Sequence, residues 1–135
     1  MDVAKCVALK RDLDRQPEPQ IVPIVTFFDG NDDLASIGCN LMEHPGIETF
    51  AAILGGLLRR SDVKAVYAQI AELDPGDDFW PFTDTVIVIG SIATEELQAI
   101  LAPLQPDEVG PVDAGLLPPA LSDDERRSAL IAWWD

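Results

Sequence analysis

The segment 83–91, TDTVIVIGS, is apolar at consecutive positions through its middle, so a strand formed here has two apolar faces. Such a strand has to be covered on both sides, which predicts a central position in a sheet. The segment 63–73, VKAVYAQIAEL, alternates with a period of two and predicts a second strand. Together the two segments require a layered fold built on a sheet.

A β-hairpin is predicted earlier in the chain, over residues 21–41. The segment 21–28, IVPIVTFF, is rich in β-branched and aromatic residues, and Pro23 restricts it to a late start or a sheet edge. The segment 34–41 alternates apolar with small or polar residues, and DGNDD (29–33) has the composition of a hairpin tip. The alternative is a structureless connection of about 18 residues, which is unusual inside a compact domain.

Apolar residues recur at helical spacing in the segments 2–15, 44–60 and 94–104. The core therefore has the order strand, strand, helix, repeated once without detectable identity between the halves. We predict an α+β fold in which a four-stranded antiparallel sheet carries helices on one face (ββαββα), with additional N-terminal and C-terminal helices.

The 135 residues, 47% of them hydrophobic, suffice for one domain with one core. A final helix is expected over about 123–134, because Ser122 and Glu125 match a capping box. The predicted parts are an N-terminal helix and linker (1–20), a ββαββα core (21–104), and a Pro-rich tail with the C-terminal helix (105–135).

The chain is strongly acidic, with a net charge of −15 from 24 acidic residues and 9 Lys and Arg. This charge disfavours binding to nucleic acid or to an anionic membrane surface. It fits either a soluble surface or an acidic face that docks a basic partner or mimics DNA. No run approaches the roughly 18 apolar residues of a membrane span. Because no signal peptide is visible and the chain has only two cysteines, we expect a cytoplasmic, reduced protein.

Two acidic loops, 29–33 and 76–84, are the main candidates for a site. The first matches the opening ligand positions of a calcium-binding EF-hand but has Leu34 where glycine is needed and Asn40 where glutamate is needed. A solvated turn and a looser cation site remain open for this loop. As hairpin tips at one end of a sheet, the two loops would form a single surface that includes Trp80. Its aromatic residues would line a pocket there or fold back as a lid on the core.

His44 is the single histidine, and a catalytic pair with Cys39 would have to use it as the base. A buried cysteine and a histidine in a helix-cap loop are the alternative. On a terminal helix, Leu130, Trp133 and Trp134 would share one face. That face would dock either on the chain's own sheet or on another protein or copy.

No catalytic residue, metal site or cofactor is assigned, because the motifs for nucleotide, zinc and serine-hydrolase chemistry are missing. We expect a non-catalytic protein-binding module (adaptor, inhibitor or immunity-type) whose partner is another protein or a second copy. The alternative is a small metal-dependent or carboxylate-based enzyme with its site at loops 29–33 and 74–84. The candidate binding residues are Asp29, Asn31, Asp32, Asp33, His44, Asp77, Asp78, Trp80 and Asp84, with Leu130, Trp133 and Trp134 as interface candidates.

Overall fold

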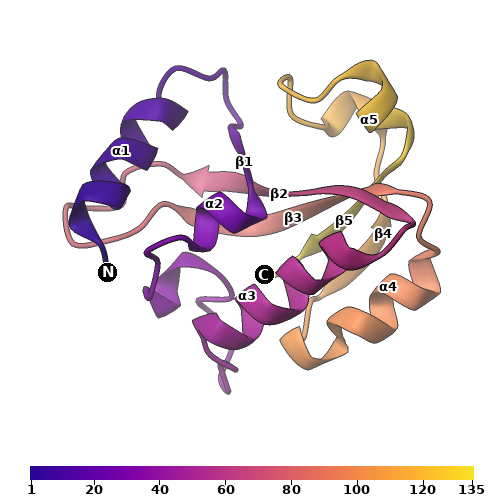
Figure 1. Ribbon diagram of the computed structural model, residues 1–135, viewed down its shortest axis with the longest axis horizontal. Coiled ribbons are helices and arrows are strands. Elements are labelled where there is room, and N and C mark those ends of the chain that lie inside the picture. Colours follow the sequence, from indigo (N-terminus) through magenta and orange to yellow (C-terminus); the bar gives the residue numbers. More distant parts are fainter.

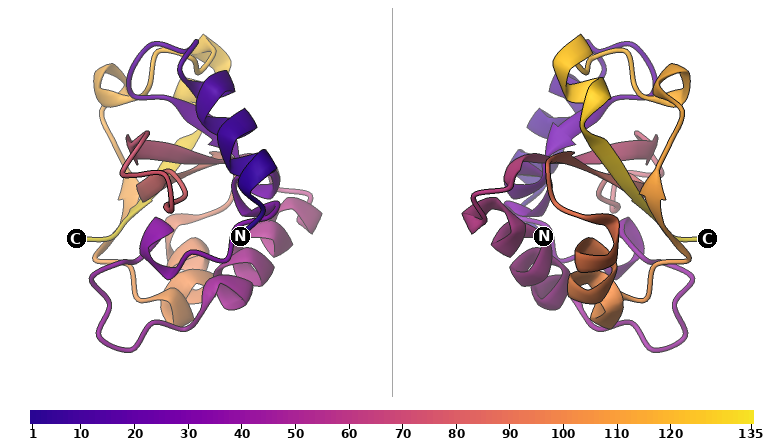
Figure 2. Two further views of the ribbon diagram at one scale, coloured as in Figure 1. Left: turned by 90° about the vertical axis from the view of Figure 1, so that its left-hand side faces the viewer. Right: turned by 90° about the vertical axis from the view of Figure 1, so that its right-hand side faces the viewer.

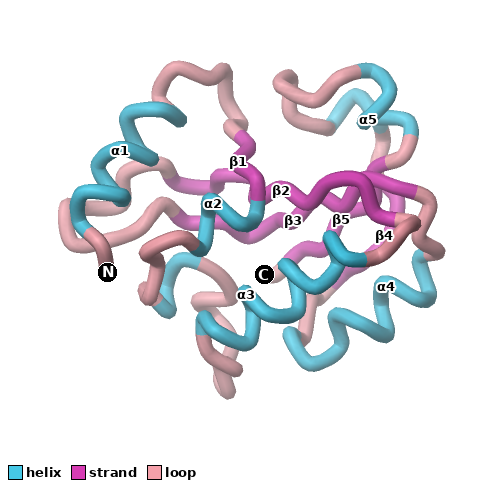
Figure 3. The backbone as a smooth tube through the Cα atoms, viewed as in Figure 1, coloured by secondary structure: helices cyan, strands magenta, loops and turns pink.

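The computed structural model describes all of residues 1–135. Its centre is a five-stranded antiparallel sheet in the order β1-β2-β3-β5-β4 (Figures 1 and 3). The strands are β1 (Ile21–Pro23), β2 (Val63–Glu72), β3 (Phe82–Gly90), β4 (Glu108–Pro111) and β5 (Ala129–Trp133). The α+β class is therefore confirmed, whereas the predicted count of four strands is wrong.

The helices lie around this sheet, and none of them is long and apolar enough to cross a membrane. The α-helices are α1 (Val3–Leu13), α2 (Ile24–Phe28), α3 (Ile47–Gly56), α4 (Thr94–Leu101) and α5 (Asp123–Arg127). Short 3₁₀ turns are found at Leu34–Ser36, Leu57–Arg59, Ala102–Leu104 and Ala114–Leu116.

The predicted central strand is confirmed. β3 pairs with β2 on one side and with β5 on the other. Val86, Ile87 and Val88 have no exposed surface, as expected for a strand with two covered faces. β2, predicted for 63–73, spans Val63–Glu72.

The predicted hairpin over 21–41 is wrong. β1 contributes three residues to the sheet edge, and the chain then turns directly into α2. Pro23 cannot donate to the ladder, so pairing ends there. Ile24 and Phe27 are then buried at a spacing of three, which is a helical spacing. The β-branched composition of IVPIVTFF concealed that short helix, and DGNDD lies in the loop after it rather than at a hairpin tip.

The predicted terminal helix over 123–134 is also wrong after its first turns. The capping box at Ser122 and Glu125 is present, but α5 ends at Arg127. The next residues form β5, which occupies the edge of β3 and itself pairs with β4. The run ALIAW is apolar without alternation, so its periodicity could not distinguish a buried strand from a buried helix. The residues predicted as a tail and helix thus supply two strands.

The sheet is covered on both faces, not on one as predicted. The larger core lies between the sheet and α1 to α4, and it includes Phe27, Phe50 and Trp134. A smaller cluster on the opposite face joins Ile87 and Ile89 of β3 to Leu117 and Leu121. These two leucines belong to the segment that leads into α5 (Figure 2).

Trp134 fixes the end of β5 in the main core. The side chain is 2% exposed, its indole N–H donates to the Leu104 carbonyl at 2.8 Å, and its ring meets Phe50 edge-on at 5.7 Å. We expect Trp134→Ala to lower the free energy of unfolding by about 3–5 kcal/mol, as for other buried aromatic residues. Urea denaturation measures this loss. Trp133→Ala is the matched control, and an equal loss there would contradict the assignment.

A hydrogen bond from the Tyr67 hydroxyl to Glu125 Oε2, at 2.6 Å, ties α5 to β2. This bond, together with burial, raises the pKa of Tyr67 from 10.0 to about 12. A raised folded-state pKa means that the contribution to stability is intact below pH 10 and is lost as the pH rises through about 12.

Tyr67 is the single tyrosine, so ultraviolet titration of tyrosinate reports on it alone. We expect Glu125→Ala to move the titration of folded protein down towards pH 10, because the acceptor is removed. The exposed Asp123 of the same helix provides the control, Asp123→Ala. A titration near pH 10 in the unchanged protein would show that the contact is not made in solution.

Candidate functional site

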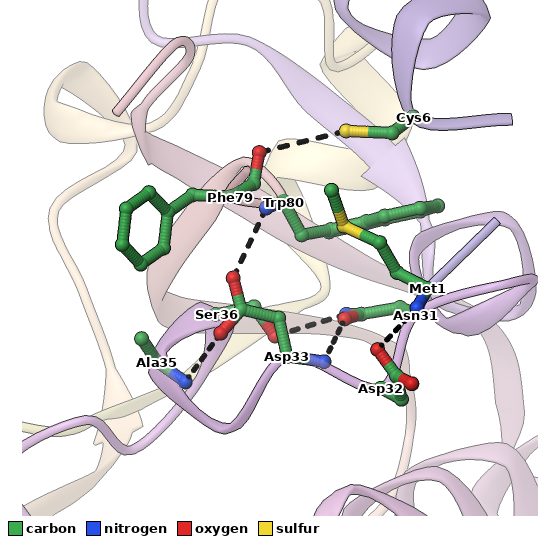
Figure 4. A network of polar contacts seen from close by, with 9 residues as sticks. All are labelled: Met1, Cys6, Asn31, Asp32, Asp33, Ala35, Ser36, Phe79 and Trp80. Atoms are coloured by element: carbon green, nitrogen blue, oxygen red, sulfur yellow. Dashed lines mark hydrogen bonds and ion pairs between the residues drawn. The ribbon is translucent and has the colours of Figure 1, made fainter. Parts of the chain in front are cut away.

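The two acidic loops meet, although only one of them is a hairpin loop. A carboxylate oxygen of Asp33 (Oδ2) accepts from the backbone N–H of Trp80 at 3.1 Å (Figure 4). The other oxygen accepts from the N–H of Ala35 at 3.0 Å and so caps the turn at Leu34–Ser36. Asp33 therefore joins the loops through structural bonds.

Asn31 and Trp80 lie inside the protein. Asn31 is 7% exposed, donates to the Ser36 hydroxyl at 2.9 Å and accepts from the Asp33 N–H at 2.9 Å. Trp80 has no exposed surface, and its indole N–H has no hydrogen-bond partner. Packing and the hydrogen bond that its N–H donates to Asp33 hold Trp80 within the core.

Three of the remaining carboxylates in these loops form ion pairs with cations of the N-terminal segment. Asp29 pairs with Lys5 at 2.6 Å, and Asp32 pairs with the amino group of Met1 at 2.9 Å. Asp74 pairs with Lys10 at 2.9 Å, and the hydrogen bond from Lys10 lowers the pKa of Asp74. The hydrogen bond from the terminal ammonium likewise lowers the pKa of Asp32.

Two further candidates, Asp77 and Asp78, are exposed and form no ion pair. Nowhere in the chain do three or more His, Cys, Asp or Glu side chains gather so that they could hold a metal ion. The loops thus converge without forming a cluster of free carboxylates.

His44 is engaged at both ring nitrogens. Nε2 lies 2.7 Å from the Ile37 carbonyl and donates to it, while Nδ1 accepts from the N–H of Gly46 at 2.9 Å. The ring therefore closes the loop before α3 and has no nitrogen left for Cys39. The catalytic pair considered from the sequence is not formed, and Cys39 is exposed rather than buried. The buried thiol is that of Cys6, whose pKa is raised by burial.

A different site appears where β5 ends. β5 pairs with β3 as far as Thr85, and beyond that point the segment 37–40 lies beside β3, with a parallel bridge between Ile37 and Thr83. The junction leaves a pocket of about 240 Å³. We call it the Trp133 pocket, and its lining residues are 38–40, 71–72, 82–84 and 133–135.

Gly38 shapes one wall of this pocket. Its φ is +63°, a left-handed conformation that glycine adopts without strain. A Cβ atom at this position would lie 2.9 Å from the Phe50 ring. Asn40 then donates from Nδ2 to the Asp135 carbonyl at 3.1 Å, which links the loop to the end of β5.

The pocket is acidic, and no Lys or Arg side chain lines it. Glu72, Asp84 and Asp135 line it, and none of them takes part in an ion pair. Asp84 accepts one hydrogen bond at Oδ1, from the Thr85 hydroxyl at 2.9 Å. Trp133, which is partly exposed, lines the same pocket.

The sequence identified part of this site. Asp84 and Trp133 were candidates, but they were assigned to a loop surface and a helix face. Leu130 and Trp134, the other interface candidates, pack on or within the chain's own core. Glu72 was missed. The sequence signal for Glu72 was its position near the end of the predicted strand 63–73. In the structure, the register between β2 and β3 places Glu72 opposite Phe82.

The chain is similar in sequence to a known protein family. The model of the family described as "Uncharacterized protein YfbO family" matches residues 4–128, and the chain belongs to that family. Uncharacterized protein YfbO of Escherichia coli (strain K12) is 25% identical over 108 residues, covering 78% of this chain and 76% of that protein. No solved structure matches the chain.

The bonds of Asp33 lead to a stability prediction. We expect Asp33→Ala to lower the free energy of unfolding by about 1–3 kcal/mol, because the N–H groups of Ala35 and Trp80 lose their acceptor. Asp32→Ala, at the exposed neighbouring carboxylate, is expected to change it little. Chemical denaturation compares the two variants. Equal effects would mean that Asp33 does not join the loops.

Proposed function

We propose that this chain is a small acidic protein-binding module, of the adaptor, inhibitor or immunity type, that holds a basic side chain of its partner in the Trp133 pocket. The observation that carries the proposal is the contrast between two sets of carboxylates. Asp29, Asp32 and Asp74 already have cationic partners within the chain. Glu72 and Asp84 line the Trp133 pocket and have no cationic partner within the chain.

The chemistry of the pocket favours a cation. Carboxylates accept charge-assisted hydrogen bonds from guanidinium or ammonium groups, and a guanidinium can meet two acceptors at once. An indole next to them adds cation–π attraction and apolar contact for the aliphatic stem. A volume of about 240 Å³ is small, so it suits one side chain of a larger partner.

The net charge of −15 supports the same type of partner, because it speeds the approach of a basic protein and repels acidic ones. A cytoplasmic location is part of the proposal. It is supported by two free thiols, one of them exposed, which fit a reducing compartment.

The enzyme alternative has less support. Acid–base catalysis needs a titratable group free to reach a substrate. Asp33 and His44 are held by backbone groups, and Asp29 and Asp32 by ion pairs. The observations thus favour binding over catalysis at loop 29–33 and at His44.

A set of blocked peptides tests the proposal. Each peptide has glycines on both sides of one variable residue, which is arginine, citrulline or glutamate. Citrulline keeps the shape of arginine and lacks its charge. We expect the arginine peptide to bind most tightly by calorimetry, with an affinity that falls as salt is added.

Glu72→Gln and Asp84→Asn are each expected to weaken binding of the arginine peptide by about tenfold, since each removes a charged acceptor. Glu48→Gln removes the same charge from an exposed carboxylate outside the pocket and is the matched control. Equal binding of the citrulline peptide, or equal effects of all three variants, would overturn the proposal.

A further inference from the structure

A second groove lies between α1 and the loop that joins β2 to β3. Its volume is about 220 Å³, and its lining includes Val3, Val7 and Asp77. Val3 and Val7 are 62% and 57% exposed and lie one helical turn apart. Two exposed valines on one helix face, next to a hollow, form a small unpartnered apolar surface.

Two aromatic side chains connect this groove with the pocket. Phe79, in the same loop, is 43% exposed and meets Phe82 edge-on at 6.1 Å between ring centroids. Phe82 lines the Trp133 pocket. The Phe79 carbonyl accepts from the Cys6 thiol of α1 at 3.5 Å, which holds the loop against the helix. A chain of contacts through Cys6, Phe79 and Phe82 therefore links the groove to the pocket.

In the left-hand view of Figure 2, the β2–β3 loop is in the middle, with α1 on one side of it and the C-terminal end of the chain on the other. A single partner segment that crosses this loop would touch both hollows.

On the side of the β2–β3 loop, negative charge borders the apolar surface. Asp77 and Asp78 are exposed and unpaired, whereas Lys10, the cation that lines the groove, already bonds to Asp74 and to the Gly76 carbonyl, each at 2.9 Å. A partner with apolar and basic residues complements such a surface, and an acidic or purely polar one does not.

We infer that the partner binds across the tip of the β2–β3 hairpin through two anchors, a basic side chain in the Trp133 pocket and an apolar side chain in the groove beside Val3 and Val7. The inference rests on the proposed function, because it adds a second anchor to the same partner. It requires a partner segment that carries a basic and an apolar residue at a fixed spacing.

Peptides that carry one arginine and one leucine, separated by increasing numbers of glycines, test the inference by calorimetry against the arginine-only parent. We expect one spacing to bind at least about tenfold more tightly than the parent, because the second contact becomes intramolecular. The gain should disappear in the double variant Val3→Ser, Val7→Ser, while binding of the parent is unchanged. Val25→Ser is the control, since Val25 is 62% exposed on α2 and lies outside both hollows.

The outcomes separate the two claims. If the arginine-only peptide binds no better than its citrulline form, the proposed function fails, and the two-anchor inference fails with it. If it does bind better, but no spacing gives a gain or the gain persists in the double variant, the inference alone is overturned.

Discussion

The backbone pairing of β5 between β3 and β4 is the constraint on which the rest of the structure depends. It brings the last residues of the chain into the interior of the sheet, so β3 is paired on both sides. It also fixes the two neighbouring tryptophans differently. Trp134 is buried against Phe50, while Trp133 remains partly exposed at the strand end. Because β5 stops beside Thr85, the segment 37–40 completes the edge, and the pocket forms between them.

The carboxylates divide into structural and free groups according to their distance from the few cations. The chain has 9 Lys and Arg for 24 Asp and Glu, so most carboxylates cannot be paired. α1 supplies Lys5 and Lys10 to the acidic loops. The Trp133 pocket receives no cation from the chain, and an added cation would therefore relieve repulsion and form new hydrogen bonds there.

Local sequence signals were sufficient for some parts of this structure and insufficient for others. The apolar run of β3, the period-two pattern of β2 and the capping box at Ser122 predicted the elements that form. Buried strands and buried helices give the same apolar run, so ALIAW could not reveal β5. At IVPIVTFF, strand propensity competed with burial of Ile24 and Phe27 on a short helix, and the tertiary contacts decided the outcome. The pocket could not be derived because it joins four segments whose proximity depends on β5.

The most direct test of the central claim, that the Trp133 pocket is a cation-binding site, is amide chemical-shift mapping by NMR with the arginine peptide added to the unchanged protein. We expect the largest shifts at residues 38–40, 71–72, 82–84 and 133–135, and we expect the citrulline peptide not to produce them. Shifts spread over the acidic surface, or concentrated in the acidic first turn of α5, would show that arginine is attracted only by the net charge and would contradict it.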